Sequence, residues 1–146
     1  MSRIKTFRGK LADASFSTIH LAGGESAEGY RIVKLELMPE EPGGTTSESV
    51  VQIFTVPQTV ASPTMDFTDD TLLAAAFMAT SDSHVYPVKD IVIFDHDVVN
   101  QDLYITHQNT GGTTAPVNYY LELEQIKMSK GEEAVVNFKA ALLHGE

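Results

Sequence analysis

The chain has 146 residues and a formal net charge of −10, from 20 acidic and 10 basic side chains, with no cysteine and no tryptophan. This length predicts a single domain, residues 1–146, around one hydrophobic core. The acidic balance argues against binding to nucleic acid or to an anionic membrane, both of which need a positive field. The lack of cysteine excludes disulfides and thiolate sites. We expect no membrane segment, since no apolar run approaches the roughly 20 residues that span a bilayer.

The N-terminal segment 1–11 is basic and reads as a strand or an arm. Residues 1–10 hold four cations and no acid, so the remaining residues, with 20 acidic and 6 basic side chains, carry a net charge of −14. The four cations are Arg3, Lys5, Arg8 and Lys10. A basic arm can dock on an acidic surface, including that of a second copy. The alternative is a solvated edge strand whose cations prevent unwanted pairing.

Short strands follow one another through the first half of the chain. Residues 3–11 and 15–21 form either a hairpin or two strands in different sheets. The segment 30–38 is the strongest strand prediction, because apolar residues alternate with charged ones there. Its predicted inward set is Val33, Leu35 and Leu37. A further strand over 50–56 ends at Pro57, which cannot donate to a ladder.

The segment 72–78 changes character and predicts one short internal helix. Its leucines, alanines, Phe77 and Met78 are mostly helix formers, and Thr68–Thr71 before it offers N-capping side chains and first-turn acids. We expect two to three turns of helix lying across the end of a sheet.

The stretch Val88–Met128 reads as the organising element of the chain. Three strand-like runs joined by turn-rich connectors predict an antiparallel meander. In the last run Val117, Tyr119, Leu121 and Leu123 alternate with polar residues, which places them on the core side. The apolar phase slips after Leu123, and a bulge near Glu124–Gln125 would restore it.

A C-terminal helix over about 130–143 completes the predicted fold. Ser129 and Glu132 have the spacing of a capping box, and the apolar residues that follow recur at helical intervals. The chain is therefore predicted to be mainly β, an antiparallel β-sandwich of jelly-roll or Greek-key type with one internal and one C-terminal helix. A twisted sheet with one helix across it is the competing architecture.

Nothing in the sequence spells out a reaction, so we predict no enzyme and no cofactor. Asp95–His96–Asp97 with His107 is the best metal candidate. However, strand neighbours point to opposite faces and too few ligands converge, so we assign no metal. A carbohydrate-binding module would need several exposed aromatic rings on one face. Tyr30, Tyr104 and Tyr120 are the only possibilities we can name.

Five segments in order along the chain resemble a group of small proteins from marine tailed bacteriophages. They are FRGKLAD (7–13), GYRIVKLELMP (29–39), DFTDDTLLAAAFM (66–78), NQDLYIT (100–106) and VNYYLELEQIKM (117–128). The resemblance implies a virion structural protein, and it carries over no catalytic residue. Within that class it implies a capsid decoration (cement) protein first, a tail or baseplate component second. A carbohydrate-binding β-sandwich is the alternative from another class.

The implied partners are the major capsid protein or other virion proteins, together with further copies of the chain in a trimer or dimer. The protein would reside in the virion after assembly in the host cytoplasm. Residues expected to contact partners are Arg3, Lys5, Arg8, Lys10, Tyr120, Glu122 and Glu124. The cations are candidates because an acidic surface attracts them, and Glu122 and Glu124 are candidates because they face outward and remain available.

Overall fold

The computed structural model describes residues 3–21, 28–42, 46–80, 88–94 and 98–127 of the chain. These residues form eight β-strands. In chain order the strands are β1 (Arg3–Leu11), β2 (Ser15–Ile19), β3 (Glu28–Pro39), β4 (Ser47–Phe54), β5 (Leu72–Thr80), β6 (Val88–Ile93), β7 (Leu103–Asn109) and β8 (Val117–Lys127). No helix in this part of the chain could cross a membrane.

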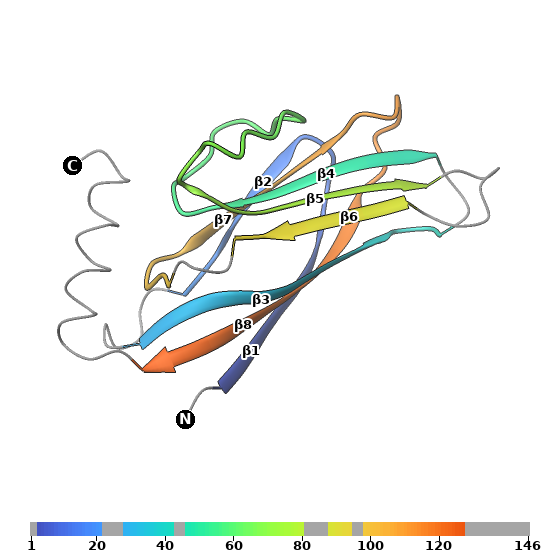
Figure 1. The fold of residues 1–146 in the computed structure, drawn as a ribbon. Helices are drawn as coiled ribbons and strands as arrows, with labels where there is room; N and C mark the ends of the chain where they lie inside the picture. The colour runs from blue at the N-terminus through green and yellow to red at the C-terminus, as the bar shows by residue number, and fades with distance from the viewer. Residues whose placement is uncertain (1–2, 22–27, 43–45, 81–87, 95–97, 128–146) are drawn as a thin grey trace.

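The strands form two antiparallel sheets (Figure 1). The smaller sheet has the order β1-β8-β3, and the larger has the order β2-β7-β4-β5-β6. Strands β1 and β2 therefore belong to different sheets, the second of the two arrangements that the sequence allowed. The prediction of a mainly β protein built from antiparallel sheets is confirmed.

The core lies between the two sheets and is built from alternate residues of their strands. Leu35, Leu121 and Leu123 come from the smaller sheet, while Ile53 and Ile105 come from the larger, and all five are at most 2% exposed. Directly paired residues of neighbouring antiparallel strands lie on the same face, so the register fixes which side chains share the core. Burial of these branched side chains is the main stabilising contribution, since the chain has no disulfide.

The predicted bulge is displaced from β8 to β3. Strand β8 pairs continuously with β1 from Val117 to Gln125, without a register shift. The irregularity lies in β3 between Ile32 and Lys34, and Val33 is the extra residue. Val33 is consequently 40% exposed, so its predicted place in the core is wrong, and Tyr30 and Ile32 continue the inward face in its stead.

The predicted meander over Val88–Met128 is wrong. Strand β6 lies at the edge of the larger sheet beside β5, β7 lies between β2 and β4, and β8 lies in the other sheet. The alternation of apolar and polar residues correctly indicates strands. It does not identify the neighbour of each strand, because a connector can pass over other strands of the same sheet, as between β6 and β7, or cross to the other sheet, as between β7 and β8.

The predicted internal helix is also wrong, because Leu72–Thr80 forms strand β5. This strand pairs with β4 on one side and β6 on the other, and most of its residues are buried on both faces. A fully buried strand has a continuous apolar sequence that resembles a buried helix. Asp69, expected near a helix start, accepts hydrogen bonds from the Thr71 N–H and hydroxyl at 2.8 and 2.6 Å and forms a turn. The predicted C-terminal helix over about 130–143 lies outside the described residues.

Gly9 makes room for a large ring in the smaller sheet. It pairs with Tyr119 of β8, and a Cβ at position 9 would lie 2.9 Å from the Tyr119 ring atom Cε1. The ring packs against the core beside this strand. Glycine is needed here for space, because the aromatic ring covers the backbone of the neighbouring strand.

We therefore predict that Gly9→Ala lowers the free energy of unfolding by about 1–3 kcal/mol, the usual cost of overpacking. Urea denaturation measures the change. In a Tyr119→Leu background, which removes the ring, the same substitution should cost much less. Equal costs in both backgrounds would show that the ring is not the cause.

Candidate functional site

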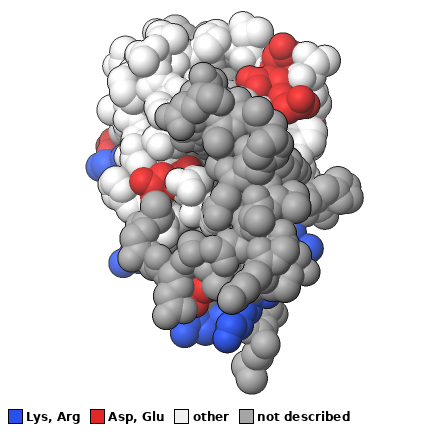
Figure 2. Space-filling view, turned by 90° about the vertical axis from the view of Figure 1, so that its left-hand side faces the viewer, with Lys and Arg blue, Asp and Glu red and all other residues white. Residues whose placement is uncertain are grey.

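The four cations of β1 do not form one patch. The register with β8 places Arg8 and Lys10 on the outer face of the smaller sheet, opposite Tyr120 and Asn118. Arg3 and Lys5 lie on the other face, at the end of β1 that extends beyond the core. These two are exposed there, because only the later part of the strand is covered. On the face shown in Figure 2, Lys and Arg side chains gather at the lower end of the molecule, where β1 begins in Figure 1.

Two of these cations have partners within the chain. The Lys10 ammonium lies 2.7 Å from a carboxylate oxygen of Glu40. The Lys5 ammonium lies 5.9 Å from the centre of the Phe7 ring and 5.7 Å from that of Tyr30, within reach of a cation–π interaction. Arg3 and Arg8 are exposed and form no ion pair with any residue that the structure describes.

The three predicted contact residues of β8 lie together on the outer face of the smaller sheet. The Tyr120 hydroxyl donates a hydrogen bond of 2.8 Å to Glu122, and this bond raises the pKa of Tyr120. Glu124 forms an ion pair with Arg31 of β3. Of the predicted contact residues, the fold thus brings Arg8, Lys10, Tyr120, Glu122 and Glu124 to one face and separates Arg3 and Lys5 from them.

The outer face of this sheet alternates in charge and carries scattered apolar side chains. Lys34 and Glu36 of β3 add one charge of each sign to it. Ile4 and Met38, more than half exposed, stand at opposite ends of the same face. The exposed arginines of β1 are the groups that favour contact with acidic surfaces.

The tyrosines required by a sugar-binding surface do not share a face. Tyr30 is buried in the core at 5% exposure. Tyr120 faces outward from the smaller sheet, and Tyr104 belongs to β7 of the larger sheet, paired with Phe54 and Thr18. Three aromatic side chains in three separate places provide no stacking platform for a carbohydrate.

The metal candidate loses His107, one of its two histidines. Asp95–Asp97 lie outside the described residues, but His107 is fully buried on the core side of β7. Its Nδ1 lies 3.1 Å from the Leu11 carbonyl oxygen and 3.0 Å from that of Ala12, so this nitrogen carries the proton. Its Nε2 then accepts a hydrogen bond of 3.0 Å from the Ser49 hydroxyl. Both ring nitrogens are occupied, and no group of three metal-binding side chains occurs in the described part of the chain.

The sequence reasoning missed that His107 belongs to a buried polar network. Ser49 Oγ lies 3.2 Å from Ser47 Oγ, and the Asn109 side-chain amide donates to Ser47 at 3.1 Å and to the Ala115 carbonyl at 3.3 Å. The backbone N–H of Asn109 donates to Asp13 at 2.7 Å. The signal was present, because serine, histidine and asparagine occupy inward positions of β4 and β7 in phase with the core residues.

This network links the connections at one end of the two sheets and does not resemble a working catalytic site. A serine–histidine hydrogen bond is the first requirement of a nucleophilic hydrolase. Here Ser49 is fully buried, and main-chain carbonyl groups occupy the place of the orienting carboxylate. The arrangement holds the β1–β2 turn and the β7–β8 connection against β4.

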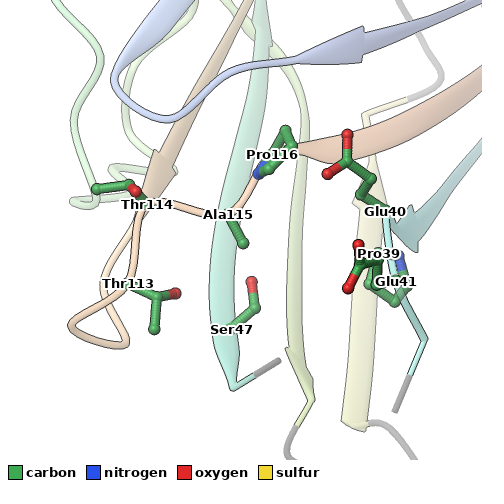
Figure 3. A pocket seen from close by; sticks show the side chains of 8 residues that line it. All are labelled: Pro39, Glu40, Glu41, Ser47, Thr113, Thr114, Ala115 and Pro116. Carbon is green, nitrogen blue, oxygen red and sulfur yellow. The ribbon is translucent and has the colours of Figure 1, made fainter. Parts of the chain in front are cut away.

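A pocket of about 350 Å³ opens beside this network (Figure 3). It lies between the end of β3, the start of β4 and the connection that precedes β8. Its lining is Pro39, Glu40, Glu41, Ser47, Thr113, Thr114, Ala115 and Pro116. Two carboxylates disfavour phosphate or any other anion, while the Ser47 hydroxyl is already bonded to Ser49 and Asn109. The pocket therefore presents no assembled reactive group.

No protein-family model matches the chain, and no curated protein matches its sequence.

The buried histidine predicts a loss of stability in mild acid. Burial lowers the pKa of His107 below its ordinary value of 6.5, and the Ala12 and Leu11 carbonyls and the Asp13 charge oppose this only in part. Well above pH 6.5 the imidazole is neutral in both folded and unfolded chains. As the pH falls from there toward the lowered pKa, the unfolded chain binds the proton first, so the free energy of unfolding decreases.

Urea denaturation at a series of pH values measures this decrease. His107→Gln should flatten the dependence in that window, whatever its effect on stability at neutral pH. His20→Gln, which removes an exposed imidazole, serves as the control. An NMR titration placing the His107 pKa at or above its ordinary value would contradict the interpretation.

Proposed function

We propose that the protein is a structural component of a phage virion, most specifically a capsid decoration protein that binds the assembled shell and stabilises it. The observation that carries the proposal is β1, an edge strand with four cations and no acid on a chain whose other residues carry a net charge of −14. Its exposed arginines are suited to binding an acidic protein surface.

The strand pairing supports a β-sandwich of the jelly-roll type. In that fold the first strand pairs with the eighth, the second with the seventh and the fourth with the fifth. All three pairs occur here. The remaining pair, the third with the sixth, is not formed among the described strands, because β6 pairs with β5 in the larger sheet. Strand β3 still contacts β6, through a hydrogen bond of 3.2 Å from Lys89 to the Leu37 carbonyl among others. Jelly rolls serve both viral capsids and lectins, so the fold supports but does not select the function.

The side chains favour binding to a capsid over binding to a carbohydrate. A lectin-like use needs an aromatic platform, and Tyr30, Tyr104 and Tyr120 lie apart. Hydrogen bonds of the buried polar network are all made within the protein, which suits a rigid module. A tail or baseplate location would use the same binding surface, and the experiment below includes it as an outcome.

The mechanism would be stabilisation by linkage. A protein that binds only the assembled lattice lowers the free energy of that lattice and leaves dissociated subunits unaffected. The basic strand would face the shell, and the acidic remainder would face solvent and keep particles apart. Further copies, as a trimer or dimer, would multiply the contacts with the lattice.

We expect the purified protein to bind expanded capsids that lack it and to raise their melting temperature. Co-sedimentation and differential scanning calorimetry measure the two effects. Arg3→Glu with Arg8→Glu should abolish binding, because two of the exposed cations of β1 become acids. The free protein should keep its stability within about 0.5 kcal/mol per substitution, the usual range at exposed positions.

Lys34→Glu with Lys127→Glu is the matched control. It makes the same charge change at exposed positions of β3 and β8 and leaves β1 intact, so binding should persist. Equal loss of capsid binding in both double variants would show that the overall charge of the protein, and not β1, determines binding. Absence of binding to capsids at saturating protein, with binding to isolated tails, would move the protein to the tail or baseplate.

A further inference from the structure

We propose that the free edge of β1 binds an extended, carboxylate-rich polypeptide segment as an additional strand of the smaller sheet. The inference deepens the proposed function, on which it rests only for the source of that segment, a neighbouring virion protein. Strand addition of this kind gains affinity from main-chain hydrogen bonds and specificity from alternate side chains.

The four edge strands of the two sheets differ in how they are protected. Strand β3 carries a bulge at Val33, and its Tyr30 exchanges two backbone hydrogen bonds, of 2.7 and 2.9 Å, with Val99. The Leu37 carbonyl of β3 also accepts a hydrogen bond from Lys89. In the larger sheet β2 has five residues and β6 has six, too short to template a long added strand.

Strand β1 has none of these protections within the described part of the chain. It has nine residues, contains no proline and pairs with β8 through a continuous register. Its only pairing partner among the described strands is β8, so one row of its backbone groups faces away from the sheet. A long, regular edge strand is a ready template for another chain, and charged side chains then decide which chain it accepts.

The side chains of β1 select against a second copy of itself. The cations stand at positions 3, 5, 8 and 10. In the antiparallel register that overlaps Arg3 with Lys10, Lys5 lies opposite Arg8, so every cation faces another cation. Like charges directly opposite are destabilising, and this register is the one with full overlap from 3 to 10.

An acidic segment would replace these repulsive contacts between cations with attractive contacts between cations and carboxylates. Arg3 and Lys5 project from one face of β1 and Arg8 from the other, so carboxylates on both faces of the added strand would be matched. Lys10 is already held by Glu40, which leaves three cations for the partner. The charge pattern of β1 therefore favours an extended segment that carries acidic side chains on both of its faces.

The probe is a capped nine-residue peptide, Glu-Thr-Glu-Val-Thr-Glu-Val-Glu-Thr, whose acids have the same spacing as the β1 cations. We expect it to bind the full-length protein in a fluorescence-anisotropy titration. The analogue with glutamine in place of glutamate should bind at least about tenfold more weakly, because charge complementarity is lost. Arg3→Glu with Arg8→Glu should abolish binding, and Lys34→Glu with Lys127→Glu should retain it.

Amide hydrogen exchange followed by NMR distinguishes strand addition from charge attraction alone. Alternate amides of β1 already bond to β8, and the intervening ones face outward. Bound peptide should slow exchange of the outward set by about tenfold or more, because these N–H groups gain hydrogen bonds. Electrostatic docking without strand addition would leave the exchange rates of the outward amides unchanged.

Several outcomes would overturn the inference. These are binding without protection of alternate β1 amides, equal affinity for the glutamine analogue, no binding at millimolar peptide, or a β1-dependent dimer in sedimentation that excludes the peptide. If the peptide binds with the expected exchange pattern but capsids do not bind, the proposed function fails and the edge site stands. If capsids bind through β1 and the peptide does not, the proposed function stands and the edge site fails.

Discussion

The fold depends on the central strand of its smaller sheet. That sheet has three strands in the described part of the chain, so β8 must contribute to the core and hold both neighbours in register. Val117, Leu121 and Leu123 are fully buried against the larger sheet, and a slip of one residue would turn all three to solvent. The same register sets the composition of the outer face. It places Tyr120 opposite Arg8 of β1. It also places the β8 acids Glu122 and Glu124 opposite two cations of β3, Lys34 and Arg31.

The sequence allowed prediction of where strands occur and which of their residues face the core, since both follow from a period of two. It did not allow prediction of strand neighbours. Residues 88–128 read as a meander because their strands are consecutive, yet β6 and β7 lie apart within the larger sheet and β8 lies in the smaller one. The alanine-rich β5 was mistaken for a helix because burial on both faces removes the alternation that marks a strand. The apolar phase slip predicts a bulge in β8, but the bulge lies in β3 at Val33. Its position depends on how the two strands pair, which the sequence of one strand does not show.

The candidate site was predictable in composition and not in arrangement. The cations of β1 and the outward acids of β8 were identified from charge and alternation. A regular strand over 3–11 already places Arg3 and Lys5 on the face opposite Arg8, but only the pairing with β8 shows which of the two faces lies outward. Nor could it show that His107, a metal candidate by residue type, binds Leu11, Ala12 and Ser49 within the core. Buried polar residues and exposed ones look alike until the fold places them.

The pairing of β1 with β8 also has a consequence for how the chain folds. Arg3 pairs with Gln125, so the contact that completes the smaller sheet closes a loop of nearly the whole described chain. Contacts of such large sequence separation slow folding, because loop-closure entropy is lost before they form. During synthesis β1 is made first of the described strands, but its neighbour β8 is made last. Its cations would keep this waiting strand soluble and limit association between unfinished chains. The same charges that suit a binding edge in the finished protein would thus protect the nascent one.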